Sequence, residues 1–104
     1  LHLVEVKGVT LEDGGHALFP DAPTERGVRH LRELASAVAL GHRATVFFVI
    51  QMAEVTDFAP NDATHPAFGE ALRQAVAAGV QAAAYTCRVA PDSIVIDRPV
   101  PVIL

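Results

Sequence analysis

The feature that most constrains the fold of this sequence is a continuous apolar run over residues 44–50, which lies between two segments with helical spacing. The run is far shorter than the roughly 20 apolar residues that cross a bilayer, so it does not indicate a membrane protein. A strand with apolar side chains on both faces is typical of the middle of a covered sheet. We therefore expect residues 44–50 to form a central strand that is buried on both faces.

The flanking segments predict two amphipathic helices. In residues 24–40, apolar residues recur every three or four positions with charged residues between them, and Gly41 is a natural stop. Either Asp21 or Thr24 can cap the start of this helix. The second helix, over residues 66–79, begins at a proline and ends at a glycine. Each apolar stripe needs a sheet to pack on, and the 44–50 strand supplies one.

The N-terminal segment predicts a β-hairpin. Residues 1–7 read as a strand that continues past Gly8, with a possible bulge there, and the turn signal at 13–15 returns the chain antiparallel as residues 16–19. The element order predicts an α/β fold: a mixed β-sheet flanked by helices. The remaining expectations are an exposed loop over 53–64 in which residues 55–58 can form a short strand, and strands over 80–89 and 94–96. The proline-containing tail 98–104 is expected to be at best an edge strand.

Composition bounds the protein further. The 104 residues suffice for one domain, and their 51% hydrophobic content excludes disorder as the main state. The net charge of -4 excludes a generally basic surface for nucleic acid, so any DNA contact would be local. The lone cysteine, Cys87, favours a reducing compartment, and we interpret the protein as cytoplasmic. The chain begins at Leu1 within a strand and its only methionine is Met52, so we expect a fragment.

Glu5 and Lys7 are the first candidate site residues, because the two-residue period of a strand places both side chains on one face. If the hairpin turn centres on Gly14, antiparallel pairing brings Asp21 near Lys7 and adds a second carboxylate. A solvated surface pair remains the plainer alternative for Glu5 and Lys7, and helix capping is the alternative for Asp21.

The helix that follows adds groups that suit a phosphate. Its free N–H groups and positive dipole end favour an anion, Glu25 and Arg26 lie in its first turn, and His30 follows Arg26 by four residues. Carboxylates at Glu5 and Asp21 would hold a divalent cation, Mg²⁺ or Mn²⁺, while a lysine and an arginine contact phosphate oxygens. Capping by Glu25 and a solvated helix face at Arg26 and His30 are the alternatives.

Three segments of the chain carry a family resemblance: Glu5–Leu11 (EVKGVTL), Phe19–Gly27 (FPDAPTERG) and His30–Leu34 (HLREL). They resemble the sugar fermentation stimulation protein A family. The resemblance implies that residues 1–104 are the C-terminal PD-(D/E)XK nuclease-like domain, with a restriction-endonuclease-like core. It also implies that an OB-like domain and the first part of the core, including an aspartate on the preceding strand, lie upstream. Glu5 and Lys7 would be the Glu-x-Lys half of the nuclease motif.

The family resemblance also implies DNA binding by the intact protein and a regulatory role in sugar metabolism. The first alternative is a metal-dependent DNA endonuclease that is active only when intact, because one carboxylate binds Mg²⁺ weakly. The isolated fragment is then expected to be inactive. The second alternative is a protein-interaction module in which the tail 99–104 adds a strand to a partner.

Overall fold

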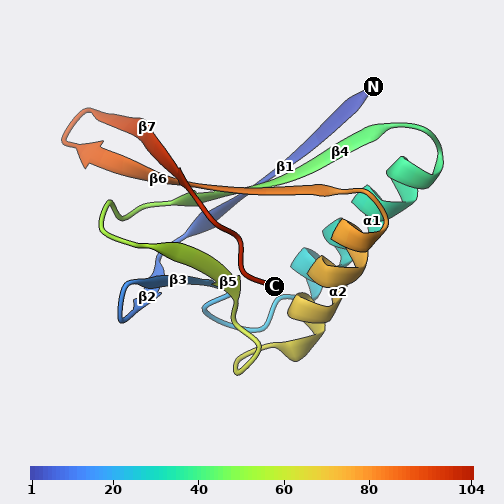
Figure 1. The fold of residues 1–104 in the computed structure, drawn as a ribbon, viewed down its shortest axis with the longest axis horizontal. Coiled ribbons are helices and arrows are strands. Elements are labelled where there is room, and N and C mark those ends of the chain that lie inside the picture. Colours follow the sequence, from blue (N-terminus) through green and yellow to red (C-terminus); the bar gives the residue numbers. More distant parts are fainter.

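A computed structural model describes all residues, 1–104, as nine elements (Figure 1). Two helices and two sheets form the mixed α/β fold that the sequence predicts. In chain order the elements are β1 (His2–Val9), β2 (Leu11–Asp13), β3 (His16–Phe19), α1 (Glu25–Ala39), β4 (Arg43–Ile50), β5 (Asp57–Pro60), α2 (Pro66–Ala77), β6 (Gln81–Ala90) and β7 (Ser93–Val100).

The larger sheet has four strands in the order β1-β4-β6-β7. β4 pairs in parallel with β1 on one side and with β6 on the other, while β7 is antiparallel to β6. The prediction of a central strand is confirmed, because β4 lies between two partners. Its apolar run reflects this place in the sheet.

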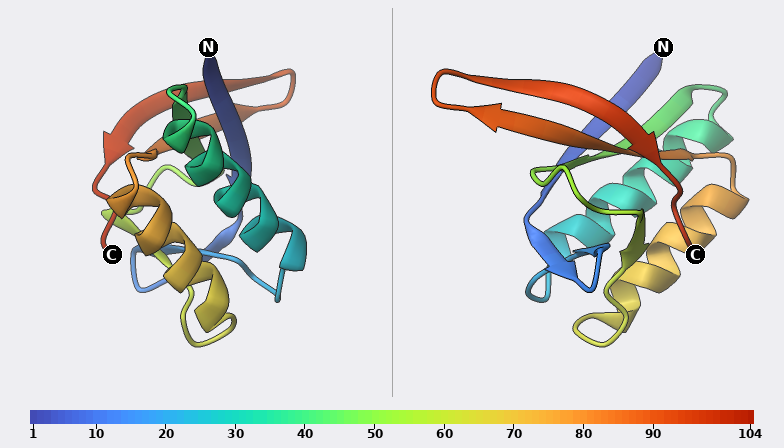
Figure 2. Two further views of the ribbon diagram at one scale, coloured as in Figure 1. Left: turned by 90° about the vertical axis from the view of Figure 1, so that its right-hand side faces the viewer. Right: turned by 60° about the vertical axis from the view of Figure 1, so that its left-hand side comes forward.

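Only one face of β4 is fully buried. Val46, Phe48 and Ile50 point toward the helices and are completely inaccessible, whereas Phe47 and Val49 on the other face are only half-buried. The expectation of burial on both faces is therefore wrong for one face. Both helices lie on the same side of the sheet (Figure 2), so no second layer of the chain covers the far side.

The helices begin and end where local chemistry dictates. Thr24 caps α1, and its hydroxyl accepts a hydrogen bond from the Gly27 N–H at 2.9 Å. Asp21, the alternative cap, does not take this role. Gly41 and Gly79, which follow α1 and α2, have φ angles of 91° and 112°, a region that glycine adopts without steric cost. Both predicted helices are confirmed within two residues.

The smaller sheet, in the order β2-β3-β5, confirms the predicted turn at 13–15 and the returning strand over 16–19 but makes the hairpin shorter than predicted. β3 returns antiparallel to β2 alone, with Leu11 opposite Leu18, while β1 belongs to the other sheet. The predicted pairing of Lys7 with Asp21 is thus wrong, and Lys7 instead pairs with Phe48. β1 also runs in unbroken register with β4, so there is no bulge at Gly8. The chain changes sheets at Thr10 because a parallel partner holds the whole of β1.

The segment 53–64 is more ordered than its polar composition suggests. It contains β5, and Val55, Phe58 and Asn61 within it are buried. The ring of Phe58 stacks on that of Phe48 with 4.2 Å between centroids, which joins the small sheet to the core. The expectation of exposure is wrong for these residues, whereas the short strand expected around 55–58 is present as β5, a parallel third strand beside the hairpin.

β6 and β7 project as a two-stranded arm beyond the body of the fold (Figure 1), and their outer residues 88–97 are exposed. β7 is an edge strand, as predicted for the proline-containing tail. The chain then crosses to the small sheet, where Phe58 donates its N–H to Pro101 and accepts one from Ile103. Part of the tail is therefore paired within the chain, through one bridge to Phe58.

Neither helix combines the length and the apolar character that a membrane crossing requires.

Candidate active site

A triangle of short polar contacts joins Glu5 and Lys7 of β1 to His30 of α1. The Lys7 ammonium lies 3.0 Å from the Glu5 carboxylate and 3.0 Å from Nδ1 of His30, and that nitrogen is 2.9 Å from the same Glu5 oxygen. The predicted common face for Glu5 and Lys7 is confirmed. The structure also brings His30 into the cluster, so His30 does not lie on a solvated helix face.

Two elements position this cluster. Alternation along β1 turns Glu5 and Lys7 toward α1, and Val4 and Val6 toward the uncovered side of the sheet. His30 lies in the second turn of α1, beside the buried residue Leu31 that fixes the helix on the core. All three polar side chains keep 13–30% of their surface accessible, so the cluster can meet a ligand from solvent.

The charges in the cluster lower the pKa of Glu5 below its usual 4.5. Partial burial acts to raise this pKa, but the hydrogen bond and charge of Lys7, with a smaller contribution from His30, outweigh it. Glu5 is thus an anion at neutral pH. Nδ1 of His30 can accept a hydrogen bond from the Lys7 ammonium, or, when protonated, it can donate one to the Glu5 carboxylate, but it cannot do both at once. The cluster therefore has two alternative hydrogen-bond arrangements.

The other predicted site residues lie outside this triangle. Arg26 and Glu25 are exposed in the first turn of α1, and neither makes an ion pair or a side-chain hydrogen bond. Arg26 is one helical turn before His30 and lies on the same side of α1. Asp21 is exposed in the bend before α1 and makes no contact with Glu5 or Lys7. The structure thus joins three of the six predicted residues.

The carboxylates are too dispersed for these residues alone to fit a metal ion. No three His, Cys, Asp or Glu side chains lie close enough together to hold one. Glu5 is the only carboxylate in the triangle, and Mg²⁺ uses one or two carboxylates in addition to its waters. Lys7 competes for the same oxygen. The cluster is better described as the Glu5 carboxylate paired with the Lys7 ammonium, next to the first turns of α1.

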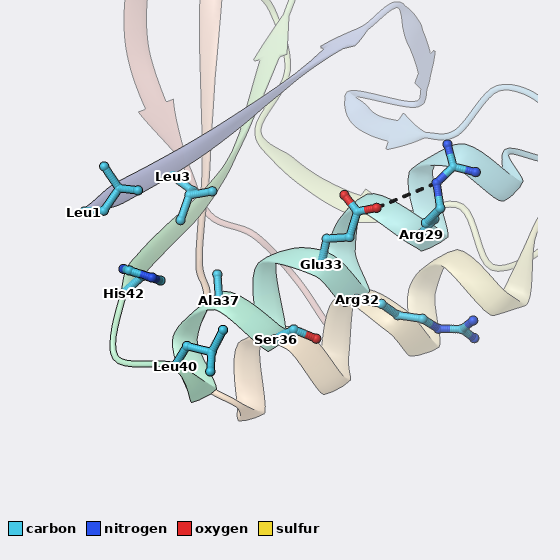
Figure 3. A pocket seen from close by; sticks show the side chains of 9 residues that line it. All are labelled: Leu1, Leu3, Arg29, Arg32, Glu33, Ser36, Ala37, Leu40 and His42. Carbon is cyan, nitrogen blue, oxygen red and sulfur yellow. Dashed lines mark ion pairs between the residues drawn. The ribbon is translucent and has the colours of Figure 1, made fainter.

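A groove runs from this cluster along β1. One part, of about 370 Å³, is lined by Leu3, Glu5, His30 and Glu33 among others. It continues into an open apolar hollow of about 400 Å³ between the start of β1 and the end of α1 (Figure 3). There Leu1 and Leu3 face Leu40 of the helix. No sequence pattern indicates this groove, because it depends on the distance between two elements.

The sequence matches the family described as "Sugar fermentation stimulation protein RE domain" over residues 1–93. It is 63% identical over 91 residues to a protein named "Sugar fermentation stimulation protein homolog" from Desulfitobacterium hafniense (strain Y51), with 88% of this chain and 40% of that relative covered. The protein of the same name from Clostridium perfringens (strain SM101 / Type A) is 49% identical over 104 residues, which are 45% of its length.

A solved structure is similar throughout. "The structure of Pyrococcus Furiosus SfsA in complex with Ca2+" superimposes with a TM-score of 0.92 at 31% identity, over 99% of this chain and 45% of that one. The arrangement of two helices and two sheets is therefore shared with it. The chain spans less than half the length of each of these three relatives.

Proposed function

Because the chain belongs to the sugar fermentation stimulation protein family, we propose that it is a DNA-binding domain with a nuclease-like phosphate site centred on Glu5, Lys7 and His30. In this proposal the core is restriction-endonuclease-like and residues 1–104 act as its C-terminal part. DNA is the partner, in a cytoplasm that keeps the buried Cys87 reduced. The family name motivates a regulatory role in sugar metabolism as part of the same proposal.

The observation that carries this proposal is the contact between Glu5 and Lys7 on the helix-facing side of an edge strand. A lysine in that position can hold a phosphate oxygen, and Glu5 orients the ammonium. Arg26 supplies a second cation without a partner in the first turn of α1, where the helix dipole also favours an anion. Glu25, beside it, supports the helix start. These groups bring two cations, Lys7 and Arg26, to the same side of α1 on a chain of net charge -4, with Glu5 and Glu25 beside them.

Cleavage of DNA would require a second carboxylate near Glu5. The outer edge of β1 is free, since β1 pairs only with β4, and an added strand there would place a side chain beside Glu5. We propose that an aspartate on such a strand, rather than the distant Asp21, would complete a site for Mg²⁺ or Mn²⁺. The Pyrococcus furiosus relative solved with Ca²⁺ makes divalent cations the first ligands to test.

The second candidate function is a metal-dependent endonuclease that acts only in the intact protein. The Glu5–Lys7 contact favours it, because a metal-bound phosphate site uses this pair of groups to hold the cation and the attacked phosphate. The 104-residue chain itself is expected to be inactive, since its residues alone do not fit a metal ion.

DNA binding is tested by fluorescence anisotropy with labelled duplex and single-stranded DNA between about 50 and 200 mM salt. We expect weak, salt-dependent binding. Lys7→Ala and Arg26→Ala should each remove one phosphate contact. Each should therefore reduce the magnitude of the slope of log affinity against log salt by about one. Arg73→Ala is the matched control, because Arg73 lies on α2 and is paired with Asp62 in the turn before that helix. Binding that all three variants retain equally would refute the assigned phosphate site.

Cleavage is tested separately on supercoiled DNA with Mg²⁺ or Mn²⁺. The 104-residue chain should not nick it, and neither should Glu5→Gln. Nicking by the unaltered chain that Glu5→Gln abolishes would contradict the expectation that only the intact protein cleaves DNA, and it would show that Glu5 alone suffices among the carboxylates. Equal nicking by both proteins would indicate a contaminant and leave binding as the function.

A further inference from the structure

The two loops that lead into the helices lie side by side. β3 and β5 are parallel and in register, with Phe19 opposite Pro60, so the chain leaves both strands at the same edge of the small sheet. Loop 20–24 then leads to α1, and loop 61–65 leads to α2. Both helices begin at the same end of the molecule (Figure 2). The loop before α2 can therefore contact the start of α1.

Asn61 holds the first part of the loop before α1. Its backbone N–H donates to the Phe19 carbonyl at 2.7 Å, and its side-chain Nδ2 donates to the Pro20 carbonyl at 3.0 Å. The same Nδ2 donates to the Thr64 hydroxyl at 2.9 Å within its own loop. Nδ2 carries two hydrogens, and these two bonds use both. Asn61 is buried, so the bonds that join the two loops are shielded from water.

His65 holds the other end of the same loop, at the residue that caps α1. Its Nδ1 accepts a hydrogen bond from the Thr24 N–H at 3.1 Å, and the Thr24 hydroxyl in turn accepts one from the Gly27 N–H at 2.9 Å. A neutral imidazole that accepts at Nδ1 carries its hydrogen on Nε2. Since His65 is itself the residue before α2, this contact joins the N-terminal ends of the two helices.

The first turn of α1 is the part of the proposed phosphate site that depends on this contact. The first N–H groups of an α-helix have no partner within the helix, and those of Glu25 and Arg26 are in that position. Their direction follows from the extended backbone of Thr24, whose φ and ψ angles are -138° and 94°. Hydrogen bonds from Thr24 to His65 on one side and from Gly27 on the other hold this backbone conformation. A rotation at Thr24 would redirect both the free N–H groups and the side chain of Arg26.

We propose that His65 is a positioning residue for the phosphate site. Its hydrogen bond to Thr24 fixes the first turn of α1, so that the free N–H groups and the Arg26 guanidinium meet a phosphate together. Asn61 supports it by fixing the preceding part of the same loop. The inference rests on the phosphate site proposed above, and it adds to that site a residue 41 positions from Thr24 in the chain.

The two cations of the phosphate site separate this role from general support of the fold. Lys7 belongs to β1, whose position is set by its pairing with β4. Arg26 belongs to the turn that follows Thr24 directly. A positioning role of His65 therefore acts through Arg26 and leaves the contribution of Lys7 unchanged. A general structural role would weaken both contributions alike.

The test compares three variants at one position of the 104-residue chain. His65→Ala removes the acceptor. His65→Asn retains one, because the side-chain oxygen of asparagine is bonded to Cγ, as Nδ1 is in histidine. His65→Gln carries its amide one bond farther out, so it keeps a polar side chain without the acceptor, and it replaces His65→Ala if that variant does not fold. His42→Ala is the matched control, because His42 follows α1 and makes no side-chain hydrogen bond.

Urea denaturation first establishes that each variant is folded, and fluorescence anisotropy with labelled duplex DNA at about 50 mM salt then measures its affinity. We expect His65→Ala and His65→Gln to weaken binding by roughly three- to tenfold, because the helix start is misplaced rather than removed. His65→Asn and His42→Ala should bind as the unaltered chain does. In NMR spectra, the amide signals of Thr24 and Gly27 should move in His65→Ala and return in His65→Asn.

Double variants show which cation His65 acts through. In an Arg26→Ala background, His65→Ala should weaken binding little further, whereas in a Lys7→Ala background it should weaken binding by its full factor. An equal loss in both backgrounds, or no recovery in His65→Asn, would assign a general structural role to His65 and overturn the proposal.

The single variants distinguish failure of this inference from failure of the proposed function. Full DNA binding by folded His65→Ala, while Arg26→Ala binds more weakly than the unaltered chain, would overturn the positioning role and leave the phosphate site in place. If neither Arg26→Ala nor Lys7→Ala changes DNA binding, the phosphate site itself is refuted, and the role of His65 is refuted with it.

Discussion

Nδ1 of His16 lies 2.7 Å from a carboxylate oxygen of Asp57, and the two residues form the first register pair of the ladder between β3 and β5. The hydrogen bond and charge of Asp57 hold the pKa of His16 above its usual 6.5, with smaller contributions from Asp13 and Glu12. An electrostatic contact thus fixes one end of the parallel pairing in the small sheet.

This contact predicts a pH dependence of stability. Because the pKa of His16 is raised on folding, its stabilising contribution is complete below about pH 6.5 and is lost as the pH rises through the raised value. The urea midpoint of the unaltered chain should therefore fall over that range, and the fall should be smaller in His16→Gln. His42→Gln is the control, because His42 makes no side-chain hydrogen bond. Equal pH profiles for all three proteins would contradict the prediction.

A second prediction concerns the charge of Glu5. Its pKa is lowered because Lys7 and His30 outweigh the effect of burial, so this carboxylate contributes stability above about pH 4.5 that is lost as the pH falls through the lowered value. In Lys7→Met, burial remains while the cation is gone, and the pKa of Glu5 should rise. Carboxyl carbon NMR titration measures it directly. Arg26→Met, which removes a cation outside the triangle, should leave the titration of Glu5 where it was.

The third prediction compares two adjacent phenylalanines of β4. Phe48 is fully buried, and its ring lies 4.2 Å from that of Phe58 and 6.0 Å from that of Phe19 between centroids. Phe48→Ala should lower the free energy of unfolding by about 3–5 kcal/mol. Phe47→Ala, on the uncovered face, should cost clearly less because its ring is partly in water. Similar losses in urea denaturation would show that the far face is as well packed as the core.

Substitution by alanine should change the stability of the protein differently at two helical glycines. A Cβ at Gly27 would lie 2.8 Å from the Thr24 methyl and 3.2 Å from the ring of Phe68, both of which are held in place. Overpacking should cost about 1–3 kcal/mol. A Cβ at Gly69 meets the Asp62 carboxylate, which is half exposed and can move. There the gain in helix propensity, about 1 kcal/mol, should offset the weakening of the ion pair between Asp62 and Arg73.

Thermal unfolding of both variants distinguishes these outcomes. Gly27→Ala should melt below the unaltered chain and Gly69→Ala close to it. A reversed order would mean that the contact between the two helices near Phe68 is looser than the structure indicates.

The parts of the fold that depend on local chemistry could be predicted from the sequence. Both helices follow from apolar spacing, a capping threonine and terminal glycines, and β4 follows from its continuous apolar run. The length of the hairpin could not be predicted, because β1 takes a parallel partner about forty positions away in the chain and leaves only Leu11–Asp13 to pair with β3. A pattern of alternating residues does not reveal which strand will be the neighbour.

The same division applies to the candidate site. Glu5 and Lys7 share a face by strand geometry alone, so their contact could be predicted. His30 joins them because packing sets the distance between α1 and β1, which the sequence does not contain. The predicted proximity of Asp21 depended on a hairpin that extends back to Lys7, and it failed because Lys7 pairs with β4 instead.

The return of the chain from β7 to β5 also bears on how the protein unfolds. The Phe58 backbone exchanges hydrogen bonds with Pro101 and Ile103, which lie just after the last strand of the large sheet. These hydrogen bonds add a backbone connection between the two sheets to the stacking of Phe58 on Phe48. Loss of the hydrogen bonds between Phe58 and the C-terminal residues should make unfolding of the two sheets less cooperative. The order in which amide protons of β5 and β6 exchange with solvent therefore reports on the integrity of the final four residues.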